Sequence, residues 1–192
     1  MKKLFFVLFS LTINVDTFAA FESTYEPLQS EKILFINGNI LDGEGNELLD
    51  TDLLIADGKI IAIGKGISVD DKDVKIIDAK NKWITPGIID IHSHMGVYPA
   101  PSVRTSSDGN EATSPVTAEV WAEHSMWVQD PQYALALKGG ITTFHVLPGS
   151  ANLIGGRGVT VKNLQRNTIQ SMKYPDAKHS LKMACGENPK RV

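Results

Sequence analysis

The residues best suited to chemistry lie in one short stretch, Asp90-Ile91-His92-Ser93-His94. Side chains two positions apart on a strand face the same side, so His92 and His94 are predicted to project together. Two neutral imidazoles on one face can ligate a divalent ion, with zinc as the first choice and iron, cobalt or nickel as alternatives. A His-x-His pattern taken alone is more often a chance occurrence or a surface pair in a loop than a metal site. The context favours a metal site, because an apolar strand precedes the pair and barrel sites lie at the carboxyl ends of strands.

The elements that must position this pair follow a strand, loop, helix, strand order. The strand at 88–91 is predicted to be buried on both faces of a parallel sheet. The later elements are a loop rich in Pro, Ser and Gly at 98–115, helical spacing at 117–128, a helix from Pro131 to Lys138 with Asp130 as its N-cap, and a buried strand at 141–147. This order indicates a βα unit with a crossover helix. Weaker patterns indicate a short strand at 159–162 and a strand or short helix at 181–184.

Residues 32–84 have a different pattern, with short apolar runs separated by tight turns. Asn37-Gly38 closes the first run, and Asp57-Gly58 is a strong signal for a two-residue hairpin turn. Four or five such strands predict a small antiparallel β-sandwich or partial barrel. A unit of about fifty residues has little core, so it needs a neighbour to pack on.

The run from Ile84 to His94, Ile-Thr-Pro-Gly-Ile-Ile-Asp-Ile-His-Ser-His, resembles the first barrel strand of the amidohydrolase superfamily. Residues 37–40 and 55–60 are similar to the N-terminal β-domain of that family, and residues 140–143 resemble its second barrel strand. The likeness is strongest to imidazolonepropionase-related and peptidase-like amidohydrolases. It covers roughly residues 32 to 192.

This resemblance implies an α/β fold, in which a small β-sandwich (composite) domain at 32–84 precedes part of a metal-dependent (β/α)8 TIM barrel at 85–192. The barrel is incomplete, because a full one takes roughly 250 residues. The implied activity is hydrolysis of a C–N bond in a non-peptide amide, a cyclic amide or a dipeptide by a metal-activated hydroxide. In this family later strands supply a bridging Lys carboxylate or Glu, two more His and a general-base Asp. That Asp is expected beyond residue 192, so the chain alone could be inactive.

Other residues are weaker candidates for the site. His145, on the strand at 141–147, could contact substrate or could be a hydrogen-bonded core histidine. Arg157 lies in Gly155-Gly156-Arg157-Gly158, which could hold a substrate carboxylate through the guanidinium and backbone N–H groups, although a plain turn is the more frequent use. The candidates for a bridging ligand are Lys162, Lys182 and Glu187.

Residues 1–19 have the order of a secretory signal peptide: Lys2 and Lys3, an apolar run from Leu4 to Ile13, then small residues at 19 and 20. The run is about ten residues, against the roughly 20 that span a bilayer. We therefore expect cleavage without a stable membrane anchor, and a periplasmic or secreted protein.

The composition excludes few other functions. The formal net charge is −3 and like charges form no block, which argues against a nucleic-acid partner. Cys185 is the only cysteine, so no intramolecular disulfide can form, and we expect it to be a small buried residue. A rival hypothesis from another class is an exported, non-catalytic metal-binding or interaction module derived from the same fold. The sequence does not determine the substrate, the oligomeric state or the number of metal ions.

Overall fold

The computed structural model describes residues 20–192, so the predicted leader, residues 1–19, lies outside the described part. Strands dominate this part: β1 (Ile33–Leu41), β2 (Glu47–Ala56), β3 (Lys59–Gly64), β4 (Lys75–Asp78), β5 (Trp83–Ile84), β6 (Ile88–Ser93), β7 (Ile141–Val146), β8 (Ile154–Arg157), β9 (Val159–Lys162) and β10 (Leu181–Met183). The helices of residues 20–192 are α1 (Gln132–Lys138) and the short 3-10 turns η1 (Arg104–Ser106), η2 (Ala122–His124) and η3 (Asn188–Arg191). None of these helices is long and apolar enough to cross a membrane.

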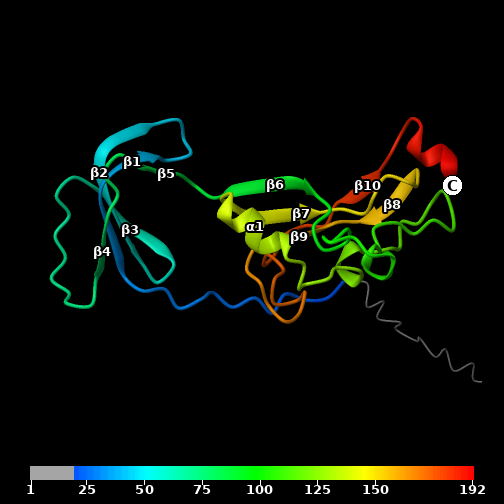
Figure 1. Ribbon diagram of the computed structural model, residues 1–192, viewed down its shortest axis with the longest axis horizontal. Helices are drawn as coiled ribbons and strands as arrows, with labels where there is room; N and C mark the ends of the chain where they lie inside the picture. Colours follow the sequence, from blue (N-terminus) through cyan, green and yellow to red (C-terminus); the bar gives the residue numbers. More distant parts are fainter. Residues whose placement is uncertain (1–19) are drawn as a thin grey trace, which may run out of the picture.

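Strands β1 to β5 form one five-stranded sheet at one end of the elongated molecule (Figure 1). The antiparallel pairs β1–β2 and β2–β3 agree with the prediction, and the hairpin turn between β2 and β3 is at Asp57-Gly58. Both turn residues have positive φ, 52° and 69°, as a two-residue turn between twisted strands requires. The prediction of an antiparallel unit was wrong for β4 and β5, which pair parallel to β1. The reason is that residues 65–74 form a long connection and not a tight turn, so the chain crosses to the free edge of β1 and enters β4 in the same direction as β1.

A three-stranded sheet, in the order β6-β7-β9, carries the predicted βα unit. Strands β6 and β7 are parallel, and α1 connects them and packs near β7 (Figure 1). The helix ends as predicted at Gly139-Gly140, where Gly140 has a φ of 87°. Strand β9 is antiparallel to β7. This sheet sets the position of the His92 and His94 segment, because β6 ends at Ser93.

The prediction that β6 is buried on both faces was wrong. Ile89 and Ile91 are 60% and 76% exposed. In the described part of the chain, β6 pairs with β7 along one edge only. The hydrophobic core of this unit contains residues of α1, β7 and β9 and none of β6, so nothing in residues 20–192 covers Ile89 and Ile91.

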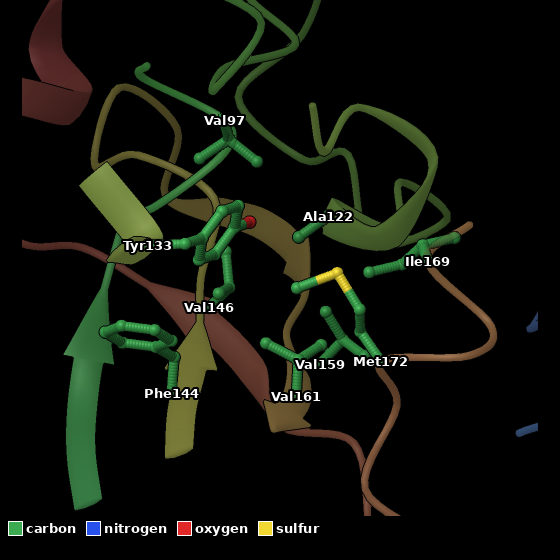
Figure 2. Packing of buried hydrophobic residues seen from close by; sticks show 9 residues of the cluster. All are labelled: Val97, Ala122, Tyr133, Phe144, Val146, Val159, Val161, Ile169 and Met172. Carbon is green, nitrogen blue, oxygen red and sulfur yellow. The ribbon is translucent and has the colours of Figure 1, made fainter. Parts of the chain in front are cut away.

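The hydrophobic core lies between α1, the strands β7 and β9, and the segment around residue 170 (Figure 2). Tyr133 of α1 packs against Phe144 of β7 with ring centroids 5.9 Å apart. The buried residues of this cluster are Val97, Ala122, Tyr133, Phe144, Val146, Val159, Val161, Ile169 and Met172. Because Val97 belongs to the segment that follows His94, the core also fixes the chain just beyond the histidine pair.

The predicted helix at 117–128 does not form, apart from the 3-10 turn η2. Val116 and Trp121 instead make parallel bridges to Ile154 and Arg157 of β8. The Arg157 N–H donates to the carbonyl of Val120 at 2.7 Å. Hydrogen bonding to a distant strand therefore replaced the local helix, although the apolar spacing fitted a helix.

The C-terminal segment pairs with β8. Strand β10 is antiparallel to β8, which decides between the predicted strand and short helix at 181–184. Cys185 lies two residues after β10, outside any helix or strand, and is exposed, so the expectation of a buried residue was wrong. The reason is that Cys185 lies just past the last strand pairing, where no layer covers it.

The carboxylate of Asp130 connects α1 to the segment after His94. Its side chain is completely buried and accepts hydrogen bonds from the N–H groups of Gln132 at 3.0 Å and Gly96 at 3.0 Å. The bond from Gln132 is the predicted capping interaction of Asp130. The helix itself begins one residue later than predicted, at Gln132, so Pro131 directly precedes it. The second bond was not predicted, and it holds the turn that follows the histidine pair.

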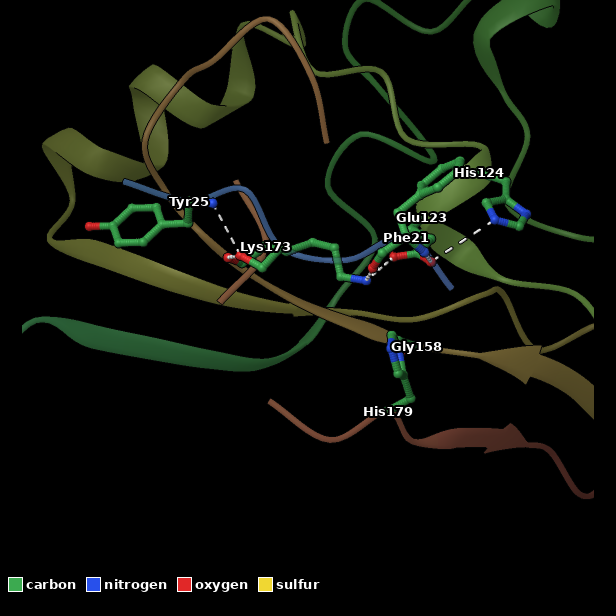
Figure 3. A network of polar contacts seen from close by, with 8 residues as sticks. Phe21, Tyr25, Glu123, His124, Gly158, Lys173 and His179 are labelled. Carbon is green, nitrogen blue, oxygen red and sulfur yellow. Dashed lines mark hydrogen bonds and ion pairs between the residues drawn. The ribbon is translucent and has the colours of Figure 1, made fainter. Parts of the chain in front are cut away.

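The described N-terminal residues lie against the three-stranded unit, where a buried ion pair holds them (Figure 3). Lys173 Nζ lies 2.6 Å from a carboxylate oxygen of Glu123, and the two side chains are 8% and 0% exposed. The N–H of Phe21 donates to the other oxygen of Glu123 at 2.8 Å, and Lys173 Nζ donates to the carbonyl of Phe21. A second contact joins the same segments, because Thr24 N–H donates to the carbonyl of Gln170.

We expect the Lys173→Met substitution to lower the free energy of unfolding by about 3–5 kcal/mol, because it leaves the Glu123 carboxylate buried without a counter-charge. The double variant Glu123→Gln/Lys173→Met keeps an acceptor for the Phe21 N–H and removes both charges, so it should lose less. Urea denaturation followed by circular dichroism measures both variants. A single variant that loses less than the double variant would contradict this account.

Candidate metal centre

His92 and His94 lie side by side at the carboxyl end of β6, as the strand geometry predicts. Their ring centroids are 5.4 Å apart and the ring planes meet at 79°. His92 is the penultimate residue of β6, and its N–H donates to the Asp90 carboxylate at 3.1 Å. This spacing allows one nitrogen of each ring to approach a common ion at the Zn–N distance of about 2.0–2.1 Å.

The orientation of His94 is fixed by the end of β7. His94 Nδ1 donates to the carbonyl of Leu147 at 2.9 Å, and the Leu147 N–H donates to the carbonyl of Ser93 at 2.9 Å. Histidines that ligate a metal usually donate their other ring N–H to a carbonyl or carboxylate, which sets the tautomer. His94 therefore presents Nε2 as the nitrogen that can bind an ion.

Lys182 reaches the same place from β10. Its Nζ lies 3.1 Å from His92 Nε2, although the two residues are 90 positions apart. The pairing of Lys182 with Gly156 of β8 sets the position of this lysine on its strand. Of the three predicted bridging candidates, Lys182 is thus the one in contact with the histidine pair.

The other two candidates have different partners. Lys162 Nζ lies 4.5 Å from the ring centroid of Tyr174 and 5.1 Å from that of Tyr25, which are cation–π distances. Glu187 pairs with Lys190 at 3.3 Å, and both side chains are exposed. Within residues 20–192, neither side chain forms a hydrogen bond or an ion pair with His92 or His94.

The described residues fit a metal ion in part. They provide two imidazole donors, one of them oriented as a ligand should be. Within residues 20–192, no three side chains of His, Cys, Asp or Glu come together as a metal site. A catalytic zinc site usually has three protein ligands, so a complete site needs one more than this pair. The predicted general-base Asp beyond residue 192 stays a prediction.

Both ring nitrogens of His145 are used within the protein. Nδ1 lies 2.9 Å from the hydroxyl of Thr160, and Nε2 lies 2.6 Å from the hydroxyl of Ser180. Burial lowers the pKa of His145, and the nearby His179 and His92 lower it further. The sequence allowed two roles for His145, and these bonds favour a hydrogen-bonded histidine over one that contacts substrate.

Arg157 is also engaged. Its guanidinium carbon lies 4.7 Å from the ring centroid of Trp121, and that ring contacts the ring of His179. The N–H of Gly158 donates to the carbonyl of Ser180 at 3.0 Å, and the segment around Arg157 is strand β8 rather than a plain turn. Stacking on the Trp121 ring leaves the in-plane N–H donors of the Arg157 guanidinium available, so a carboxylate-binding role for Arg157 stays a prediction.

Sequence reasoning missed the contacts that orient the pair. The contact of the Leu147 carbonyl could not be recognised from the sequence, because every residue has a backbone carbonyl. Asp130 was recognised only as a helix cap, and its bond to Gly96 depends on how α1 packs against the loop.

Comparisons with known proteins identify relatives of this chain. Amidohydrolase tasK of Hapsidospora irregularis is 34% identical over 152 residues, which cover 73% of this chain and 16% of that protein. The dihydroorotase of Bacillus cytotoxicus is 34% identical over 117 residues, which cover 61% of this chain and 21% of that protein. The crystal structure of an amidohydrolase from Thermotoga maritima MSB8 matches with a TM-score of 0.73 and 39% identity, covering 83% of this chain and 40% of that one. No family model matches the chain.

This chain therefore belongs to the amidohydrolase superfamily, over the part of those proteins that it spans. That part is less than half of each of the three relatives. The mostly β structure with few helices fits such a partial span.

Because the folded state lowers the pKa of His145 below its ordinary value of 6.5, the unfolded chain binds a proton more readily. Stability from this residue is complete above about pH 6.5 and is lost as the pH falls below it. We expect the urea midpoint to fall between pH 7.5 and 5.5, and to fall less in a His145→Gln variant. Equal pH dependence in the His145→Gln variant and the parent would refute this assignment.

Proposed function

We propose that this chain supplies two metal ligands, His92 and His94, to an amidohydrolase that hydrolyses a C–N bond in a small non-peptide amide, a cyclic amide or a dipeptide. The observation that carries the proposal is the paired orientation of the two rings, with His94 fixed by the Leu147 carbonyl. The relatives named as amidohydrolase and dihydroorotase support this reaction class.

The chemistry of the proposed site follows from its donors. A divalent ion held there, with zinc favoured by imidazole ligands, would polarise the scissile carbonyl and lower the pKa of a bound water towards about 7. His92 and His94 each offer one neutral ring nitrogen. The Leu147 carbonyl keeps the proton of His94 on Nδ1, so Nε2 stays free for the ion.

Lys182 is our choice for the bridging ligand. An amine that lies 3.1 Å from His92 Nε2 is close enough to reach an ion bound by that nitrogen. A lysine ammonium cannot itself ligate a cation, because it has only donors. The neutral amine can add CO2 and release a proton, and the resulting carbamate has oxygen atoms that ligate metals. The family resemblance implies either such a lysine carboxylate or a Glu at a bridging position.

The barrel architecture is part of the proposal. Strands β6 and β7 are parallel, α1 connects them, and the histidine pair lies at the carboxyl end of β6. These features suit the first units of a (β/α)8 barrel, whose sites lie at the carboxyl ends of its strands. We further propose export to the periplasm or outside the cell, and removal of the leader can be read from the N-terminal residue of the secreted protein.

The rival, a non-catalytic exported metal-binding module, is favoured by one observation: two strong ligands, rather than three, come together in residues 20–192. The two functions differ in turnover. A metal-loaded preparation that binds zinc through the pair and hydrolyses no amide, cyclic amide or dipeptide would support the module.

The zinc affinity should fall by more than about tenfold when His92 and His94 are both replaced by alanine, because both imidazole ligands of the ion are lost. Isothermal titration with zinc measures the change. His124→Ala is the matched control, since His124 is an exposed histidine in η2. Unchanged zinc binding in the double variant would end the metal assignment.

If Lys182 bridges as a carbamate, added bicarbonate should raise the number of zinc ions bound per chain. The Lys182→Ala variant should show no bicarbonate effect, whereas Lys162→Ala should behave like the parent. Metal analysis after dialysis gives the stoichiometry. A bicarbonate effect that survives in Lys182→Ala would exclude this lysine as the bridge.

A further inference from the structure

A cavity of about 240 Å³ lies beside His94 and is separate from the His92–Lys182 contact. It is formed by three loops that follow β6, β7 and β10, so it lies on the same side of the molecule as the histidine pair. Its lining residues are His94, Tyr98, Asn110, Gly149, Ser150, Ala151, Asn188 and Arg191. They include one guanidinium, two amides and two hydroxyls, and none of them is an Asp or Glu.

The hydrogen bonds in the wall leave donors for a ligand. The Asn110 amide donates to the Tyr98 hydroxyl oxygen, and the Asn188 amide donates to the Ser150 hydroxyl oxygen at 2.7 Å. In both pairs the hydroxyl acts as an acceptor, so its own hydrogen remains available to a further acceptor. A ligand with oxygen acceptors would satisfy both hydroxyls.

The charge of the cavity favours an anion. Arg191 forms no ion pair within the described part of the chain, whereas Glu187 of the same turn is paired with Lys190. Two acidic residues of the loop after β6, Asp108 and Glu111, line a neighbouring cavity and not this one. A guanidinium with hydroxyl donors beside it is well matched to a carboxylate.

Two glycines make this wall possible. A Cβ added to Gly149 would lie 2.6 Å from the Tyr98 hydroxyl and would also collide with the Asn110 amide. A Cβ added to Gly109 would collide with the Tyr98 ring. The Gly149 N–H donates to the Gly109 carbonyl at 2.6 Å, which holds the two loops together. The two loops can therefore approach this closely because glycine, which has no side chain, occupies positions 109 and 149.

We propose that this cavity is a carboxylate-binding subsite, in which Arg191, Tyr98 and Ser150 hold the carboxylate of an N-acyl amino acid or a dipeptide. The identity of the substrate rests on the proposed amidohydrolase function, because the subsite would place the amide of such a ligand next to His94. The binding of a carboxylate does not rest on it, since none of these three side chains needs a metal.

The test uses the full chain, labelled with 15N, after EDTA has stripped any metal and has itself been removed by buffer exchange, so that neither metal nor chelator competes for the probe. Titration with N-acetyl-L-alanine, followed by NMR, should shift the amides of Ser150 and Ala151. N-acetyl-L-alaninamide, which lacks the charge, should bind about fivefold more weakly, and Arg191→Met should weaken the acid by about three- to fivefold. The matched control is Lys190→Met, which removes one positive charge from the same turn and outside the cavity.

Equal binding of the acid and the amide would overturn the proposal, and so would an equal loss in Lys190→Met and Arg191→Met. The second result would mean that general charge attraction holds the probe. If Arg191→Met changes the fold, Ser150→Ala gives an independent reading and should also weaken the acid. Zinc titration of the His92→Ala variant separates the outcomes, because His92 does not line the cavity, so metal binding can fail while carboxylate binding persists.

Discussion

The candidate site depends on the hydrogen bonds that join the end of β6 to the end of β7. The Leu147 N–H donates to the Ser93 carbonyl, and the Leu147 carbonyl accepts from His94 Nδ1. Leu147, the residue after β7, therefore holds both the Ser93 carbonyl at the end of β6 and the ring of His94. An imidazole that already has its tautomer set loses less freedom when it binds an ion. Without the parallel pairing of β6 and β7, the two histidines would lie on a free strand end.

The surroundings of this junction rigidify it from both sides. The core under β7 fixes the strand, and Asp130 ties α1 to Gly96, two residues beyond His94. On the far side of the core, the buried Glu123–Lys173 pair holds the described N-terminal residues against the same unit. Buried charges are costly unless they are paired and hydrogen-bonded, so these contacts commit the segments to one arrangement. By contrast, the outer surface of β6 stays open, with exposed Ile89 and Ile91.

Local patterns predicted well those features that depend on neighbouring residues. The hairpin turn at Asp57-Gly58 and the helix ending at Gly139-Gly140 were correct, because positive φ and helix termination are properties of a few adjacent residues. The helix expected at 117–128 failed, because its residues found backbone partners on β8, more than 30 positions away. The parallel placement of β4 and β5 was missed for the same reason, since the choice of sheet edge depends on which edge is already occupied.

For the site, the sequence by itself determined that His92 and His94 share a face, since a period of two is a property of any strand. It also identified the family through the motif around that pair. Only the tertiary structure decided which of Lys162, Lys182 and Glu187 reaches the pair, because all three are long polar side chains with no distinguishing local pattern. The same holds for the cavity beside His94, whose walls come from loops that follow three different strands. Spacing along the chain encodes the direction of a side chain on one strand, whereas contacts between strands depend on how the whole chain packs.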